Sequence, residues 1–417
     1  MRVYLESLGC RLNAAEIETL ARQFAGAGHD VVQQPRGADV IVLNSCAVTS
    51  QASRSSRHRI RALHRDSPDA KIAVLGCWAT EDLARARRLA GVRWVIPNVE
   101  KSAAVTEILG MATTTARWAP GRWGHTRAFL GVQDGCDEAC TYCVTRILRG
   151  PAKSRPLAEV VATVQELVAS GAQEIVLTGV CLGAYGQDRG IDHELAALVR
   201  AILHETGVSR LRLSSIEPWD ITPELLDLWQ DGRLCRQLHM PLQSGSDVIL
   251  KRMGRRITVS GFLALVTAAR AVQPEMALTT DLIAGFPGET EADFAETIAV
   301  VKEVGFSRLH VFPYSQRAGT AAMRLPDQVP KAIRKARAGR LRDLGQALAA
   351  VYQARFAGAV LPVLWEQRAG DDDRRRGLTD NYLAVVSRDS RARFNTITAT
   401  KMVAVDGDVL IGEVVDG

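Results

Sequence analysis

Three of the chain's eight cysteines, Cys136, Cys140 and Cys143, lie within eight residues, in the stretch QDGCDEACTYC. A structural zinc site closes its tetrahedron with four ligands, and an iron–sulfur cubane normally takes four thiolates. The nearest histidine, His125, lies eleven residues upstream and ahead of a strand-like run, so it is poorly placed to complete the set. Three thiolates would leave one iron of a cluster open to a non-protein ligand.

Three further cysteines, Cys10, Cys46 and Cys77, are far apart in the sequence but occupy the same kind of position. Each follows a β-rich run: VYLESLGC, DVIVLNSC and KIAVLGC. Because the carboxyl ends of parallel strands meet at one edge of a sheet, we expect the three thiols to converge there. Scattered cysteines are usually buried packing residues. The same placement at three strand ends instead favours a second functional site formed by these cysteines.

The composition is typical of a folded protein, since 47% of the 417 residues are apolar and 24% are charged. No run of eighteen residues lacks a charge, and the N-terminus lacks the layout of a secretion signal. We therefore expect a cytoplasmic protein with no membrane partner. Thiols stay reduced in the cytoplasm, which favours metal or redox chemistry for clustered cysteines. The sequence has no phosphate-cradling loop, zinc-protease helix or nucleophile elbow.

The elements that must position these cysteines follow an alternating pattern. In the first hundred residues, the β-rich runs VYLESL, ADVIVLN, KIAVLG and RWVIPN alternate with helical periodicity at residues 13–27 and 81–89. This pattern predicts a small parallel α/β domain. Residues 113–125, rich in Thr, Pro and Gly, are typical of a linker.

A second alternating region holds the strand candidates AFLGVQ, EIVLTG, RLRLSS, QLHMPLQ, LTTDLIAGF and RLHVFPY. Helical patterns separate them at residues 157–170, 193–206, 223–230, 260–272 and 292–304. Six βα units predict a partial (β/α)6 barrel with its function at the carboxyl ends of the strands. After a basic helix at 330–357, the runs VLPVLWE, YLAVVS, NTITATKMVAV and DVLIGEVV predict a small all-β barrel. We place the three domains at residues 1–115, 122–350 and 355–417.

The motif C-x3-C-x-aromatic-C, with Tyr142 as the aromatic, directly follows the first barrel strand. It resembles the signature of the radical S-adenosylmethionine (SAM) superfamily. The resemblance implies a [4Fe–4S] cluster on Cys136, Cys140 and Cys143 whose open iron binds SAM. An electron from the cluster would then split SAM to a 5′-deoxyadenosyl radical.

A three-cysteine set ahead of such a barrel, with a small β domain behind it, resembles the methylthiotransferase family over nearly the whole chain. This resemblance implies an auxiliary [4Fe–4S] cluster on Cys10, Cys46 and Cys77, whose open iron carries the sulfur to be inserted. It also implies that the C-terminal barrel is a TRAM domain that helps to bind substrate. SAM would serve twice, once as methyl donor to that sulfur and once as radical source. No catalytic side chain beyond the clusters is expected.

Several stretches are most similar to the branch that modifies C2 of N6-threonylcarbamoyladenosine, next to the anticodon of tRNA: LGCRLNAAEIETL, NSCAVTSQASRSSR, EIVLTGVCLGAYG, RLSSIEP and HMPLQSGSDVILKRMGR. The branches acting on isopentenyladenosine in tRNA, or on an aspartate of a ribosomal protein, differ after the first cysteine. The net charge of +6 and the basic stretches at residues 54–65 and 331–342 suit RNA, although single charge runs are usually solvated helix faces. The C-terminal region has no net positive charge, so a ribosomal protein remains an alternative substrate.

Polar and glycine residues at the ends of barrel strands are the candidate SAM contacts. Glu217 and Gln243 could instead cap the following helices, and the GFPGE loop at Gly285 could be only a turn. The full set is Tyr142, Thr178, Gly179, Ser215, Glu217, Gln243, Asp281 and Gly285.

Arg149, Arg155 and Arg317 could contact substrate or SAM, but exposed arginines are usually only solvated. Cys235 is expected to be a core thiol. Cys181 follows the second barrel strand, where the family does not usually carry a cysteine, and our hypothesis is that it is no obligatory ligand.

The resemblance further implies an electron donor, such as flavodoxin or ferredoxin, and a sulfur donor. A non-catalytic iron–sulfur protein that binds RNA is the alternative from another class. That alternative would explain the cysteine sets and the basic stretches, but not a six-unit barrel carrying a SAM-type triad.

Overall fold

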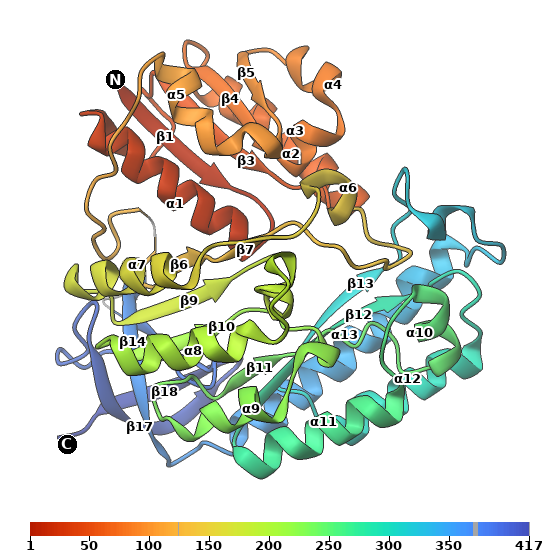
Figure 1. Cartoon of the computed structure of the whole chain (residues 1–417). Coiled ribbons are helices and arrows are strands. Elements are labelled where there is room, and N and C mark those ends of the chain that lie inside the picture. The colour runs from red at the N-terminus through yellow and green to blue at the C-terminus, as the bar shows by residue number, and fades with distance from the viewer. Residues whose placement is uncertain (124, 370–373, 417) are drawn as a thin grey trace.

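The computed structural model describes residues 1–123, 125–369 and 374–416 (Figure 1). Its N-terminal part is a parallel sheet in the order β2-β1-β3-β4-β5. The strands are β1 (Arg2–Ser7), β2 (Asp30–Val32), β3 (Val40–Ser45), β4 (Lys71–Gly76) and β5 (Val92–Ile96). The central strands β3 and β4 are almost fully buried, as their continuous apolar runs predict for a sheet covered on both faces.

Helices cover this sheet: α1 (Arg11–Gly26), α2 (Ser50–Asp66), α3 (Cys77–Glu81), α4 (Leu83–Arg87) and α5 (Ala104–Leu109). The single helix predicted at residues 81–89 is wrong. The helix breaks at Asp82, whose carboxylate accepts a hydrogen bond from the Arg85 amide at 3.1 Å and so starts α4.

The six predicted barrel strands are confirmed. They are β6 (Ala128–Gly131), β9 (Glu174–Thr178), β10 (Arg210–Leu213), β11 (Gln237–His239), β12 (Ala277–Ala284) and β13 (Arg308–Pro313). They form two parallel three-stranded sheets, which the bridges Leu211↔Leu234 and Ser215↔His239 join into one curved wall.

Helices on the outer face of this wall bury its apolar side (Figure 1). They are α7 (Leu157–Ala169), α8 (Glu194–Glu205), α9 (Pro223–Leu226), α11 (Val259–Val272) and α12 (Glu291–Val304), with α10 (Asp247–Met253) after β11 and α13 (Lys331–Ala354) after β13. Trp118 and Trp123, from the predicted linker at 113–125, are buried in the same core, so that stretch is packed rather than free.

The C-terminal region is a closed five-stranded barrel, as expected, in the order β14-β15-β16-β18-β17. The strands are β14 (Val360–Ala369), β15 (Arg374–Thr379), β16 (Ala384–Ser387), β17 (Ile397–Asp406) and β18 (Val409–Val414). Buried Arg212 joins this barrel to the central one, because it pairs with Glu174 at 2.6 Å and donates to the Asp380 carbonyl at 2.9 Å. Across the described residues, no helix is long and apolar enough to cross a membrane.

Candidate functional site: two cysteine triads

The first three cysteines converge as predicted, because β1, β3 and β4 are neighbours in the sheet. Cys10 precedes α1, Cys46 follows β3, and Cys77 opens α3 directly after β4. Gly9 makes the approach possible: its φ is +98°, and a Cβ placed there would lie 2.6 Å from the Cys46 sulfur. We call Cys10, Cys46 and Cys77 the first triad.

The second triad, Cys136, Cys140 and Cys143, lies in the loop between β7 (Gln133–Asp134) and α6 (Thr145–Arg149). Gly135 starts this loop with a φ of +72°, and a Cβ there would lie 1.9 Å from the Pro151 carbonyl oxygen. The Thr145 amide points at the Cys143 sulfur, 3.4 Å away. The loop is therefore shaped by backbone contacts before any metal binds.

Neither triad gathers its three sulfurs as tightly as one zinc ion requires. Thiolates on one zinc, bonded at about 2.3 Å, would lie about 4 Å apart. Among the described residues, only His239, Asp281 and His310 form a group whose ligand atoms all lie within 4.8 Å of one another. Neither cysteine triad meets that limit, which counts against a single zinc ion bound there.

Burial raises the pKa of Cys46 and of Cys140 to about 11 each. Both are therefore neutral thiols at neutral pH until iron binding displaces the proton. Next to Cys140, the Arg255 guanidinium lies 3.9 Å from the sulfur and favours the thiolate. The residues present thus fit two iron–sulfur clusters, each with three protein ligands.

Helix α6 connects the two triads. Arg149, its last residue, is buried and reaches α1, where it donates to Asn13 at 2.6 Å and pairs with Glu16 at 3.0 Å. It also pairs with Asp134, at the base of the second triad's loop, at 2.7 Å. Burial opposes ionisation of Glu16, but Lys101 and Arg149 outweigh it and lower the pKa of Glu16. This network fixes one triad relative to the other.

Asn98 makes a second connection between the triads. Its amide nitrogen lies 3.5 Å from the Cys77 sulfur and donates to the Leu148 carbonyl at 2.8 Å. Leu148 is buried in the same hydrophobic cluster as Cys77 and Trp78. Helix α6, which follows the loop of the second triad, is therefore packed against the core of the N-terminal sheet.

Two of the candidate SAM contacts lie beside the second triad. Tyr142 packs edge-on against Phe286, with ring centroids 6.4 Å apart. Glu217 makes no capping hydrogen bond and instead pairs at 2.6 Å with Arg255, the arginine next to Cys140. Its alternative role as a helix cap is therefore wrong.

The other candidates sit at strand ends, as predicted. Gln243 is buried with a φ of +73°, and Ser246 rather than Gln243 precedes α10 as its N-cap. A Cβ at Gly285 would lie 2.3 Å from the Arg334 side chain, and the Gly285 amide donates to Glu289 at 2.9 Å. Buried Thr178 ends β9 with Gly179 behind it, and Ser215 bridges to His239.

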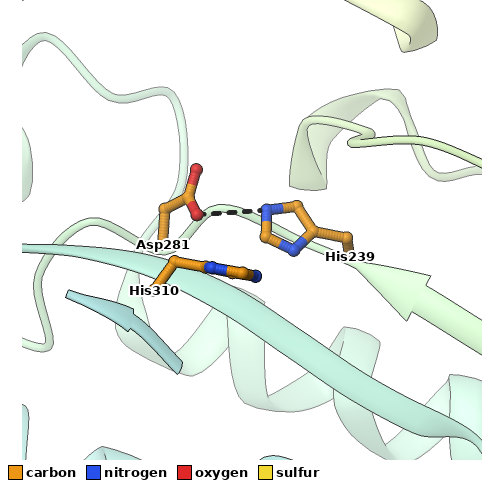
Figure 2. A group of neighbouring side chains, drawn as sticks. All are labelled: His239, Asp281 and His310. Atoms are coloured by element: carbon orange, nitrogen blue, oxygen red, sulfur yellow. Dashed lines mark ion pairs between the residues drawn. The ribbon is translucent and has the colours of Figure 1, made fainter. Parts of the chain in front are cut away.

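Asp281 belongs to a group that the sequence analysis missed (Figure 2). His239 from β11, Asp281 from β12 and His310 from β13 point toward one another, and all three are half-buried. One imidazole nitrogen of His239 lies 3.4 Å from the Asp281 carboxylate and the other lies 2.8 Å from the Thr279 hydroxyl. Burial, together with nearby cations, lowers the pKa of His310. The available signal was a histidine in each of two barrel strands.

The arginines singled out in the sequence have structural partners. Arg149 and Arg317 are buried, so the expectation that they are only solvated is wrong. Arg317 pairs with Glu81 and donates to Ser53 at 3.2 Å. Arg155 donates to Thr163 at 2.9 Å. Cys235 is a buried core thiol, as expected.

Cys181 lies behind the second triad, and a hydrogen bond between the two sulfurs lowers the pKa of Cys136 and raises that of Cys181. Cys181→Ala is expected to keep full iron content and SAM cleavage, because Cys181 is not one of the three cysteines of the second triad. Iron per chain and 5′-deoxyadenosine formation, measured beside Cys235→Ala, check this. Loss of half the iron only in Cys181→Ala would contradict it.

Comparison with known proteins agrees with this geometry. Residues 130–301 match the model of the radical SAM superfamily, and residues 2–96 match an uncharacterized family, UPF0004. The threonylcarbamoyladenosine tRNA methylthiotransferase of Bacillus subtilis (strain 168) is 35% identical over 96% of this chain and 93% of its own length. The enzyme of the same name from Thermotoga maritima is 38% identical over 87% of this chain and 86% of its own.

The chain belongs to the radical SAM methylthiotransferase family.

A relative with a different substrate in its name is similar as well. The tRNA-2-methylthio-N6-dimethylallyladenosine synthase of Parafrankia is 34% identical over 99% of this methylthiotransferase and 86% of its own length. Among solved structures, the radical SAM methyltransferase TsrM from Kitasatospora setae has a TM-score of 0.55 at 15% identity, covering 77% of this chain and 75% of its own. That likeness supports the fold alone.

Proposed function

We propose that this methylthiotransferase replaces the hydrogen at C2 of N6-threonylcarbamoyladenosine, next to the anticodon of tRNA, by a methylthio group. The observation that carries the proposal is the pair of cysteine triads held against each other through α6 and Asn98. Relatives at 35% and 38% identity that bear the name of this reaction support it.

In this proposal the first triad holds an auxiliary [4Fe–4S] cluster, and the second holds the cluster that binds SAM. Bound there, the clusters and SAM supply a radical that can break an inert carbon–hydrogen bond, and the sulfur that replaces the hydrogen. The protein positions these groups. Arg149 and Asn98 set the separation of the triads, and Leu148 packs in the same hydrophobic cluster as Cys77.

The SAM-binding set remains Tyr142, Thr178, Gly179, Ser215, Glu217, Gln243, Asp281 and Gly285. Within it, the carboxylate of Glu217, held by Arg255 beside Cys140, is placed to orient the amino group of SAM. On the substrate side, the half-buried His239 and His310 present donors and acceptors to a nucleoside in the barrel. The proposed domains are residues 1–115, 122–350 and 355–417, and the reaction takes place between the first two.

The isopentenyladenosine substrate is the second candidate, because the dimethylallyladenosine synthase of Parafrankia is also 34% identical. An aspartate of a ribosomal protein is the remaining alternative. We also propose a cytoplasmic location, a flavodoxin or ferredoxin as electron donor, and a separate sulfur donor.

Nucleoside mass analysis of bulk tRNA from cells with and without the gene tests the function. Loss of 2-methylthio-N6-threonylcarbamoyladenosine, with accumulation of its unthiolated precursor, is the expected result. Unchanged threonylcarbamoyladenosine nucleosides, with loss of the methylthiolated isopentenyl nucleoside, would instead assign the second candidate.

A further inference from the structure

A pocket of about 400 Å³ opens where the N-terminal sheet region meets the loop after β13. Helices α2, α3 and α4 form one side, and Arg317 and Ala318 form the other. Contacts across its edge fix the two sides together: the Ser50 amide donates to the Ser315 hydroxyl at 3.0 Å, and Arg317 pairs with Glu81. The pocket is therefore part of the folded domain junction.

The pocket carries an excess of positive charge. Arg54, Arg57 and Arg85 line it, and none of these three has an ion-pair partner among the residues that the structure describes. The pocket has two carboxylates. Glu81 forms an ion pair with Arg317, and Asp82 caps α4. Burial, followed by repulsion from Arg85, Arg54 and Arg61, lowers the pKa of Arg57. An anion in the pocket would relieve this repulsion.

The sequence of α2 produces this surface. Ser56, Ile60 and Leu63 are buried, and buried Ser53 lies at the pocket, where it donates to Glu81 at 2.8 Å. Arg54, Arg57 and Arg61, spaced by three and four residues, share another face that is exposed or half-buried. Within the basic stretch at 54–65, Arg59 pairs with Glu6 at 2.7 Å, whereas Arg54 and Arg57 line the pocket.

The other basic stretch behaves differently. On α13, Arg337 pairs with Glu289 at 2.7 Å, Arg340 pairs with Glu291 at 2.7 Å, and Arg334 donates to the Tyr314 carbonyl at 2.8 Å. These arginines hold α13 against the barrel. Lys331, Lys335 and Arg342 on α13 are exposed as well, but α2 has more arginines without an ion-pair partner among the described residues.

We propose that the pocket of Arg54, Arg57 and Arg85 binds the phosphate backbone of the RNA substrate beside the first triad. This inference rests on the proposed tRNA substrate. The pocket is suited to bind phosphates rather than bases. Its one aromatic residue, Trp78, is 1% exposed and cannot stack on a base. Trp78 also follows Cys77 directly, so phosphates bound here would flank a nucleotide presented to the triad.

Charge reversal tests the site in the full-length, cluster-reconstituted protein. The variant Arg57→Glu/Arg85→Glu is compared with Arg200→Glu, a matched control on α8 whose arginine is exposed beside a different pocket. The measurement is the Kd for a threonylcarbamoyladenosine-containing anticodon stem-loop RNA at several salt concentrations. We expect binding at least about tenfold weaker and a salt slope lower by about one for each phosphate that the variant no longer binds.

Two readouts separate a binding effect from a folding defect. SAM cleavage without RNA should be unchanged in the double variant, because the pocket does not include the second triad. The milder Arg54→Ala, at an exposed position where truncation rarely alters stability, should weaken binding in the same direction.

The proposal is overturned if the double variant and Arg54→Ala bind RNA as tightly as Arg200→Glu does. A wild-type protein that modifies the RNA while both pocket variants bind normally would leave the proposed function standing and remove only this site. If the wild-type protein does not bind RNA but binds a basic ribosomal protein, both the proposed function and this site are wrong, since this pocket would repel such a partner.

Discussion

Cys77→Ala is expected to abolish methylthiolation while SAM is still cleaved to 5′-deoxyadenosine, whereas Cys140→Ala should abolish both. The two cysteines belong to different triads on separate elements: Cys77 opens α3 behind the N-terminal sheet, and Cys140 lies in the loop after β7. Loss of one thiolate should therefore empty one site and leave the other. Product analysis for both reactions, with iron content per chain, measures this.

Cys235→Ala is the matched control, because it removes a buried thiol that belongs to neither triad. It should keep both activities and the full iron content. If Cys77→Ala stopped 5′-deoxyadenosine formation while the second cluster remained bound, the proposed division of work between the triads would be wrong.

Arg149→Met should lower methylthiolation about a hundredfold or more, with SAM cleavage largely retained. The substitution leaves Glu16 without one of its two cations, next to the first triad, and removes the bond from α6 to Asn13. Removal of one partner of a buried ion pair lowers the free energy of unfolding by about 3–5 kcal/mol. A shift of about 1 Å between reacting groups is enough for a hundredfold loss in rate.

Arg146→Met on the same helix is the control, since Arg146 is exposed. Arg149→Lys should restore part of the activity, because lysine keeps the charge but cannot form the same fork of hydrogen bonds. A structural defect alone would lower both reactions together. Equal loss of SAM cleavage and methylthiolation in Arg149→Met would contradict its role as a positioning residue.

The two triads could be predicted because their cysteines follow the ends of strands. Strands such as β3 and β4 are continuous apolar runs, and the cysteine after each is visible in the sequence. Their convergence then follows from parallel pairing alone. The six barrel strands were predictable for the same reason.

The contacts between the triads could not be predicted. Arg149 and Asn13 are 136 residues apart, and Asn98 and Leu148 are 50 apart, so no local pattern joins them. The group of His239, Asp281 and His310 likewise depends on the register of three strands. Strand β15 was missed because its sequence, RRRGLT, is rich in arginine, and closure of the C-terminal barrel rather than β propensity makes it a strand.

The most direct test of the central claim is a reaction with purified, cluster-reconstituted protein. Two anticodon stem-loops that differ only in the target base, N6-threonylcarbamoyladenosine or isopentenyladenosine, are incubated with SAM, sulfide as sulfur source and a reductant without oxygen. Mass analysis of the digested RNA should find a methylthio group on the threonylcarbamoyl nucleoside and almost none on the other. Methylthiolation of the isopentenyl nucleoside alone, or SAM cleavage with no sulfur in either RNA, would contradict the proposed function.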